Sequence, residues 1–160
     1  MASVSNPEQE RFFAVMALHN YFLNADFLRD LFMKRIKRNQ SPSDVNPVTA
    51  MDDLIAMSLW YATVYVVMEG WREAKLSDPE VDELLADRHV ERLRRFRNQV
   101  FHYQRAYDNP KLLEFLGADD ADAHAATDWI KRTHKALGRA IQQAAEDILR
   151  SERDADGAPT

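Results

Sequence analysis

The sequence predicts an all-α fold, an up-and-down bundle of four or five helices. The chain has only four glycines, and its prolines stand where helices would begin rather than inside them. Apolar residues also recur at spacings of three and four along several long segments. With 160 residues and no internal repeat, the chain can bury one core, so we expect a single bundle domain over residues 1–151 and a disordered polar tail over residues 152–160.

The first half of the chain predicts two long helices. The first has Asn6 as its cap and Pro7 at its first position, and runs to about Asn39. The second follows Pro47 and continues to about Lys75. Because its middle is apolar on nearly every side, we expect other helices or a second subunit to surround it. The expected buried stripe of the first helix comprises Phe12, Val15, Met16, His19, Phe22, Leu23 and Phe27.

The second half predicts a short helix and two longer ones. Asp78 and Pro79 are typical of a cap and first position, so a short helix should run through Leu85. The next helix contains the stretch "VERLRRFRNQVFHYQ" and is broken from Tyr107 onward. A last helix is expected from about Asp120 to Ser151. Its predicted buried stripe comprises Trp129, Ile130, Thr133, Leu137, Ile141, Ala144, Ile148 and Leu149.

Composition limits the classes of function. The chain has no cysteine, which excludes a disulfide framework, a thiolate metal site and a cysteine nucleophile, and fits a reducing compartment such as the cytoplasm. The N-terminal residues do not resemble a secretory signal. The longest uncharged run, Leu54 to Met68, is too short to span a bilayer, so we expect no membrane partner. A net charge of -5 argues against a general nucleic-acid coat.

We expect neither a metal nor a cofactor. No glycine-rich phosphate loop is present, and "ADDADAH" reads as a helix start, where carboxylates favour the positive end of the helix dipole. Four histidines lack the spacing to carboxylates that a metal site needs: His19, His89, His124 and His134. Four aromatic residues at helical spacing are expected in the core rather than in a ligand pocket: Trp60, Tyr61, Tyr65 and Trp71.

The segment from Arg88 to Arg105 is strongly basic, with six arginines against Glu91 alone. On a helical wheel its apolar residues form one arc that should face the core. Arg97 and Gln104 fall inside this arc, whereas a polar stripe contains Asn98 and His102. The predicted apolar arc comprises Val90, Leu93, Phe96, Val100, Phe101, Tyr103 and Tyr107.

An arginine in a core position needs a charged partner. Leaving the Arg97 guanidinium unpaired in the core would cost several kcal/mol. Glu69 is the only carboxylate between Asp53 and Glu73 on the apolar second helix, so we predict that Glu69 pairs with Arg97.

The stretch "RFRNQVFHYQ" resembles the signature of the HEPN (higher eukaryotes and prokaryotes nucleotide-binding) superfamily. That signature is an arginine, four to six residues and a histidine, often with a polar residue directly after the arginine. Arg97, Asn98 and His102 match these three positions. In a toxin subgroup a tyrosine stands two residues after the histidine. This chain has Gln104 there and Tyr103 beside the histidine instead.

The resemblance implies a helical bundle that acts as a metal-independent endoribonuclease or an RNA-binding protein. It also implies a homodimer in which two motifs meet, and a toxin or defence role with a neutralising protein partner. His102 would be the general acid or base for the ribose 2'-hydroxyl and the leaving oxygen, Arg97 would stabilise charge on the phosphate, and Asn98 would orient one of them. Glu69 and Tyr103 would support this site, and the RNA backbone would be attracted by Arg94, Arg95 and Arg105.

The residues also allow a non-enzymatic function. Charge runs are usually solvated faces, and ion pairs often serve structure alone. In this alternative, the chain is a helical dimerisation or interaction module with a structural Arg97–Glu69 pair. The discriminating feature is whether Arg97 and His102 lie together in an open cleft.

Overall fold

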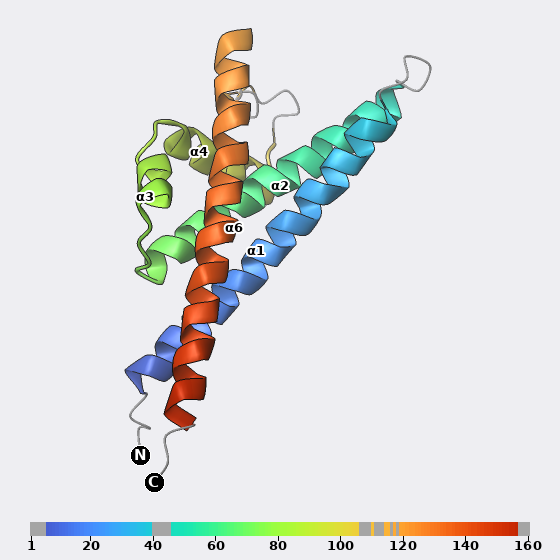
Figure 1. The fold of residues 1–160 in the computed structure, drawn as a ribbon. Coiled ribbons are helices and arrows are strands. Elements are labelled where there is room, and N and C mark those ends of the chain that lie inside the picture. Colours follow the sequence, from blue (N-terminus) through green and yellow to red (C-terminus); the bar gives the residue numbers. More distant parts are fainter. Residues whose placement is uncertain are drawn as a thin grey trace.

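The chain folds into an all-α helical bundle, as predicted. The computed structural model describes residues 6–39, 46–105, 110, 114, 115, 117 and 119–156. Within these residues there are helices and no strands (Figure 1). The helices are α1 (Pro7–Arg38), α2 (Pro47–Glu73), α3 (Pro79–Leu85), α4 (His89–Phe101) and α6 (Asp120–Asp156).

Side-chain caps fix the starts of the first three helices. The side chain of Asn6 accepts a hydrogen bond from the backbone of Glu8 at 3.1 Å, and Asp78 accepts from two backbone N–H groups of α3 at 3.1 Å each. Asn46 forms a reciprocal capping box with Thr49. A proline follows each cap, where its missing N–H costs nothing. The predicted starts at residues 7, 47 and 79 are therefore confirmed.

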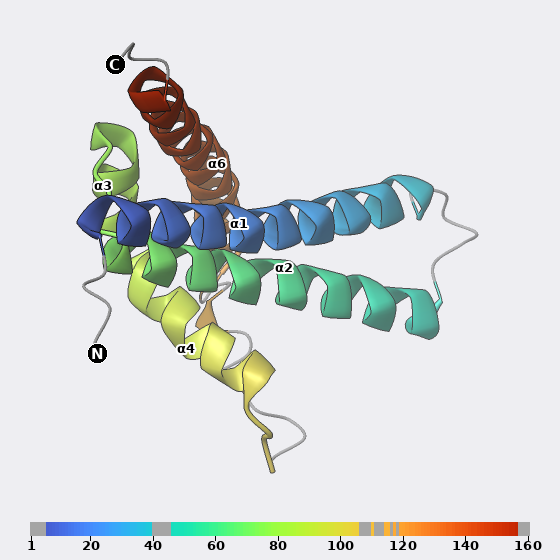
Figure 2. The same ribbon diagram turned by 90° about the horizontal axis from the view of Figure 1, so that it is seen from below.

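A partly buried chain of polar groups joins α1, α2 and α6 where they cross. The two long helices α1 and α2 pack against each other, and α6 crosses both (Figures 1 and 2). The indole N–H of Trp60 donates to Nδ1 of His134 at 3.2 Å, and Nε2 of His134 lies 3.0 Å from Asp26. Because Nδ1 accepts from the indole, the histidine carries its proton on Nε2 and donates it to the carboxylate.

α2 is the central helix, although neighbouring helices cover only part of it. By length and composition alone it could cross a membrane, but half of its most apolar window is buried inside the fold. Its C-terminal half packs against α1, α4 and α6. The predicted core aromatics are all at most 4% exposed, which confirms that expectation for Trp60, Tyr61, Tyr65 and Trp71.

Two predicted stripes are only partly correct. On α1, Val15 is buried, but Leu23 and Phe27 are 50% and 69% exposed, because no described helix covers that side. On α6, the stripe from Trp129 to Ile141 is buried, whereas Leu149 is exposed where only α1 runs beside the helix (Figure 1). The helix also continues to Asp156, so residues 152–156 are helical where a disordered tail was expected. Residues 157–160 lie outside the described part.

α4 is shorter than predicted. It ends at Phe101, and His102 has an extended backbone with φ of -114° and ψ of 136°. The predicted apolar arc is therefore wrong at Tyr103, which lies beyond the helix and is 92% exposed. Tyr107, also predicted in this arc, lies outside the described residues. Val100 is the last residue of α4 that packs against the core, and Phe101 is already half exposed. A helix of 13 residues depends on such packing, so it stops where the contact with α2 stops.

Candidate functional site

The predicted pair between Arg97 and Glu69 is present where α4 crosses α2. Nη2 of Arg97 lies 2.5 Å from Oε2 of Glu69. The Arg97 side chain is 22% exposed and the Glu69 side chain 43% exposed, so the pair lies at the edge of the core rather than inside it. A guanidinium at such a position is stabilised by the carboxylate and still reached by solvent on one side.

Two more groups hold the guanidinium of Arg97. Nη1 donates to the side-chain oxygen of Asn98 at 3.0 Å, and the guanidinium carbon lies 5.2 Å from the centre of the Tyr65 ring. Nε of Arg97 is buried without an acceptor among the described residues. Burial, followed by the negative charge of Glu69, raises the pKa of Tyr65, so its ring stays neutral beneath the cation. Arg97 is thus fixed in direction by three neighbours.

His102 lies just beyond the C-terminal end of α4, with its side chain exposed. Its backbone N–H donates to the carbonyl of Asn98 at 3.1 Å, and its carbonyl accepts from the side chain of Gln104 at 2.9 Å. Within the described residues, its imidazole forms no hydrogen bond with Arg97 or Asn98. One copy of the chain therefore brings Arg97, Asn98 and Glu69 together but leaves His102 and Tyr103 as separate exposed groups.

The three arginines predicted to attract RNA differ in the ion pairs that they form. Arg94 forms a two-point ion pair with Glu91, at 2.9 and 2.7 Å, and this pair lowers the pKa of Glu91 and raises that of Arg94. Arg95 pairs with Glu114 at 2.8 Å. Arg105 is exposed and has no ion pair among the described residues. Ion pairs as exposed as those of Arg94 and Arg95 contribute little free energy, so an anionic ligand can replace their carboxylate partners. All three arginines are therefore accessible to such a ligand.

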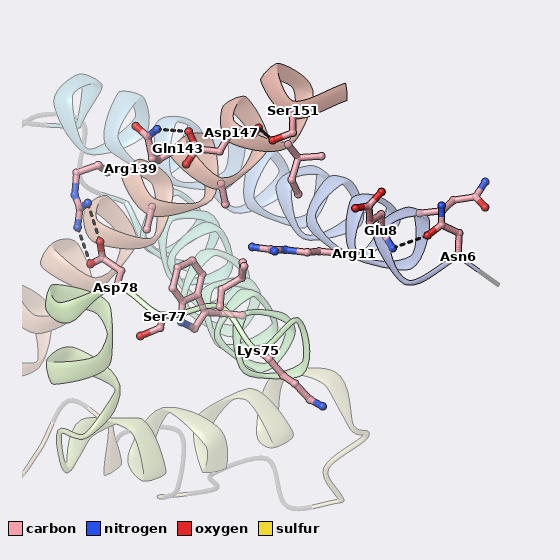
Figure 3. Close-up of a pocket in the computed structure, with 16 residues that line it drawn as sticks. Asn6, Glu8, Arg11, Lys75, Ser77, Asp78, Arg139, Gln143, Asp147 and Ser151 are labelled. Carbon is pink, nitrogen blue, oxygen red and sulfur yellow. Dashed lines mark hydrogen bonds and ion pairs between the residues drawn. The ribbon is translucent and has the colours of Figure 1, made fainter. Parts of the chain in front are cut away.

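A large groove, which no sequence pattern indicates, lies elsewhere on the molecule. It has a volume of about 1030 Å³ and runs between the start of α1, the α2–α3 connection and α6 (Figure 3). Arg139 on its wall is held by Asp78 at 2.8 and 3.0 Å and by Glu80 at 3.0 Å. This bonding lowers the pKa of Asp78 and raises that of Arg139.

The groove offers little chemistry of its own. Arg139 is already paired with two carboxylates, and although Ser77 donates its hydroxyl to Asp82 at 2.6 Å, no histidine is among the residues that line the groove. None of the predicted site residues lines it. Within the described parts of the chain, no three histidine, aspartate or glutamate side chains lie close enough to hold a metal ion. The cluster around Arg97 therefore remains the candidate site.

This cluster presents one oriented guanidinium, and the exposed His102 directly follows the helix that carries it. The sequence predicted Arg97, Asn98 and Glu69 as neighbours but missed Tyr65, which was expected only as a core residue. Its position one helical turn before Glu69 on α2 is the signal that could have revealed it. No family model, curated protein or solved structure matches the chain, so the HEPN resemblance rests on the residues of the motif alone.

Proposed function

We propose that this protein cleaves RNA without a metal ion, at a site that two copies of the chain complete. The observation that carries the proposal is the fixed orientation of Arg97 by Glu69, Asn98 and Tyr65, at a place where the pair still reaches solvent. A half-buried, pre-oriented guanidinium is suited to a phosphate, because its orientation need not be established during the reaction.

The reaction uses the nucleophile that RNA supplies. His102 takes the proton of a ribose 2'-hydroxyl, and the 2'-oxygen attacks the adjacent phosphorus. The bond from phosphorus to the 5'-oxygen breaks, and that oxygen leaves with a proton from the second copy's His102. The products are a 2',3'-cyclic phosphate and a 5'-hydroxyl. Arg97 stabilises the extra charge on the phosphate, Asn98 orients Arg97, and Arg105 attracts the RNA backbone.

The need for a second copy follows from the end of α4. His102 is exposed beyond the helix, and within the described residues its imidazole forms no hydrogen bond with Arg97, Asn98 or Glu69 of its own chain. A two-fold dimer brings two such exposed histidines and two arginine clusters to one interface. The toxin or defence role and the neutralising protein partner belong to this proposal as its biological setting.

The test is cleavage of a mixed single-stranded RNA in EDTA by the wild-type protein and by His102→Ala and Arg97→Lys. We expect cyclic-phosphate ends from the wild type and their loss in both variants. Arg97→Lys keeps the positive charge beside Glu69 but not the planar guanidinium, so a folded, inactive variant separates chemistry from stability. His124→Ala removes an exposed histidine on α6 and is the matched control, which should remain active. No cleavage by the wild type, or full activity in His102→Ala, would refute the proposal.

One observation favours a second function, a helical interaction module. The guanidinium of Arg97 is occupied on both terminal nitrogens, by Glu69 and Asn98, and the pair joins α2 to α4 as a structural ion pair would. In this function His102 has no chemical role. The interaction module would be favoured by three results together: the wild type is inactive, Arg97→Lys lowers the stability of the protein, and His102→Ala does not.

A further inference from the structure

Trp71 lines the groove between the start of α1, the α2–α3 connection and α6, and it differs from the other two tryptophans of the chain. The indole N–H of Trp60 donates to His134 at 3.2 Å. That of Trp129 donates to the carbonyl of Leu84 at 3.1 Å. Trp71 is only 2% exposed, yet its Nε1 is buried without an acceptor among the described residues. Since buried N–H groups are nearly always hydrogen-bonded, this group points to an acceptor that is not part of the described chain.

The floor of this groove is apolar. Ala140 and Ala144 stand one turn apart on α6 and both line the groove, so their short side chains leave space beside the helix. Leu76 and Ile148 are half-buried and line the same space as Trp71. The groove volume of about 1030 Å³ is at the upper end of the ~300–1,000 Å³ that ligand sites have. The groove can therefore hold the apolar body of a small organic molecule.

Arg11 provides an unpaired positive charge in the groove. Figure 3 shows its side chain reaching from α1 into the groove, whereas Lys75 is directed away from it. Arg11 is exposed, and within the described residues its guanidinium forms no ion pair or hydrogen bond. Arg139, by contrast, is held by Asp78 and Glu80. The planar guanidinium of Arg11 can therefore bind a carboxylate through two parallel hydrogen bonds.

The other charges of the groove favour a ligand with a single negative charge. Glu8 and Asp147 also line the groove, so a ligand with several negative charges, such as RNA or a nucleotide, would be repelled by them. A ligand with one negative charge is neutralised by Arg11 alone. The formal charges of the lining residues balance, with three cations and three anions: Arg11, Lys75 and Arg139, and Glu8, Asp78 and Asp147.

We propose that this groove binds a small amphipathic monocarboxylate. The carboxylate pairs with Arg11, the apolar body lies against Trp71 and Ile148, and an oxygen of the ligand accepts the hydrogen bond of Trp71 Nε1. Because this N–H is enclosed by its neighbours, the side chains of the floor adjust as the ligand enters, which is common at binding surfaces. The inference does not rest on RNA cleavage, since no residue of the Arg97 cluster lines the groove.

The test is titration of the isotope-labelled chain with naphthylacetate, an aromatic monocarboxylate, followed by the three indole N–H signals in NMR spectra. Trp71→Phe identifies the Trp71 signal. We expect this signal to shift saturably as its N–H gains an acceptor, while the signals of Trp60 and Trp129, which have acceptors already, stay in place. Naphthylacetamide has the same shape without the charge, and acetate has the charge without the apolar body. Each should bind at least about tenfold more weakly.

Variants with unchanged helical circular dichroism separate the contributions to binding. Arg11→Gln should weaken the binding of naphthylacetate about tenfold or more but not that of naphthylacetamide. Ala144→Phe should fill the groove and abolish binding without removing a polar group. Arg132→Gln is the matched control, because Arg132 is exposed on α6 and has no ion pair in the described residues but does not line the groove; it should bind as the wild type does.

Four results would overturn the proposal. The Trp71 signal does not move, or all three indole signals move alike. Naphthylacetamide binds the wild type as tightly as naphthylacetate does, or Arg11→Gln binds naphthylacetate as tightly as Arg132→Gln does.

Discussion

The Arg97–Glu69 pair gives a stability prediction that can be worked out from its exposure. We consider Arg97→Met, Glu69→Gln and the double variant, since methionine keeps an apolar stem over Tyr65. Removing one partner of a fully buried pair costs about 3–5 kcal/mol, whereas exposed pairs contribute less than about 1 kcal/mol. With side chains 22% and 43% exposed, the pair lies between these limits. We expect Arg97→Met to cost about 2 kcal/mol, with a coupling energy of about 1 kcal/mol.

The assay is urea unfolding of all four proteins, followed by circular dichroism at fixed protein concentration. For a chain of this size, about 2 kcal/mol corresponds to a melting temperature lower by about 4–8 °C. Arg94→Met is the matched control, because its pair with Glu91 is exposed on both sides and should contribute little. Strictly additive effects of Arg97→Met and Glu69→Gln, or an Arg97→Met as mild as Arg94→Met, would refute the assigned role of the pair.

Two further predictions concern the crossing of α1, α2 and α6. A Cβ at Gly138 would come within 3 Å of the Phe22 ring. We therefore expect Gly138→Ala to lower the free energy of unfolding by about 1–2 kcal/mol, even though alanine has the higher helix propensity. Adding Phe22→Leu should restore part of this loss, as measured by chemical denaturation. Burial lowers the pKa of His134 below 6.5, because the folded state favours the neutral ring. The neutral ring therefore contributes stability that is complete above pH 6.5 and is lost as the pH falls through the lowered pKa. His134→Gln should flatten this acid branch in melting curves measured across that range, and an unchanged branch would show that another group causes it.

The helix starts were predictable because the physics that sets them is local. Asn6 and Asp78 satisfy N–H groups within three residues, and the prolines that follow have the backbone angle of a first helical turn. The partner of Arg97 was predictable for a different reason. A guanidinium on an apolar face needs a carboxylate, and α2 offers only Glu69 near the crossing.

The end of α4 was not predictable from the same rules. No glycine or proline stands near Phe101, and the sequence continues with residues that suit a helix until Tyr107. The helix stops because the core it packs against ends at Val100, which is a tertiary property. His102 is consequently not where a helical wheel puts it. This is why the sequence could name the residues of the motif but not their relative positions.

The apolar character of α2 connects the sequence and the fold. A helix that is apolar on nearly every side should be enclosed, but the N-terminal half of α2 has only α1 beside it, and its buried residues begin at Ala56 (Figures 1 and 2). This half exposes Val48, Met51, Leu54 and Ile55 beside the exposed face of α1. Periodicity could not distinguish these positions from core positions, because it reports apolar residues and not which surface covers them. Residues 47–57 of α2 therefore have the composition of a core helix but are not covered as one by the described part of the chain.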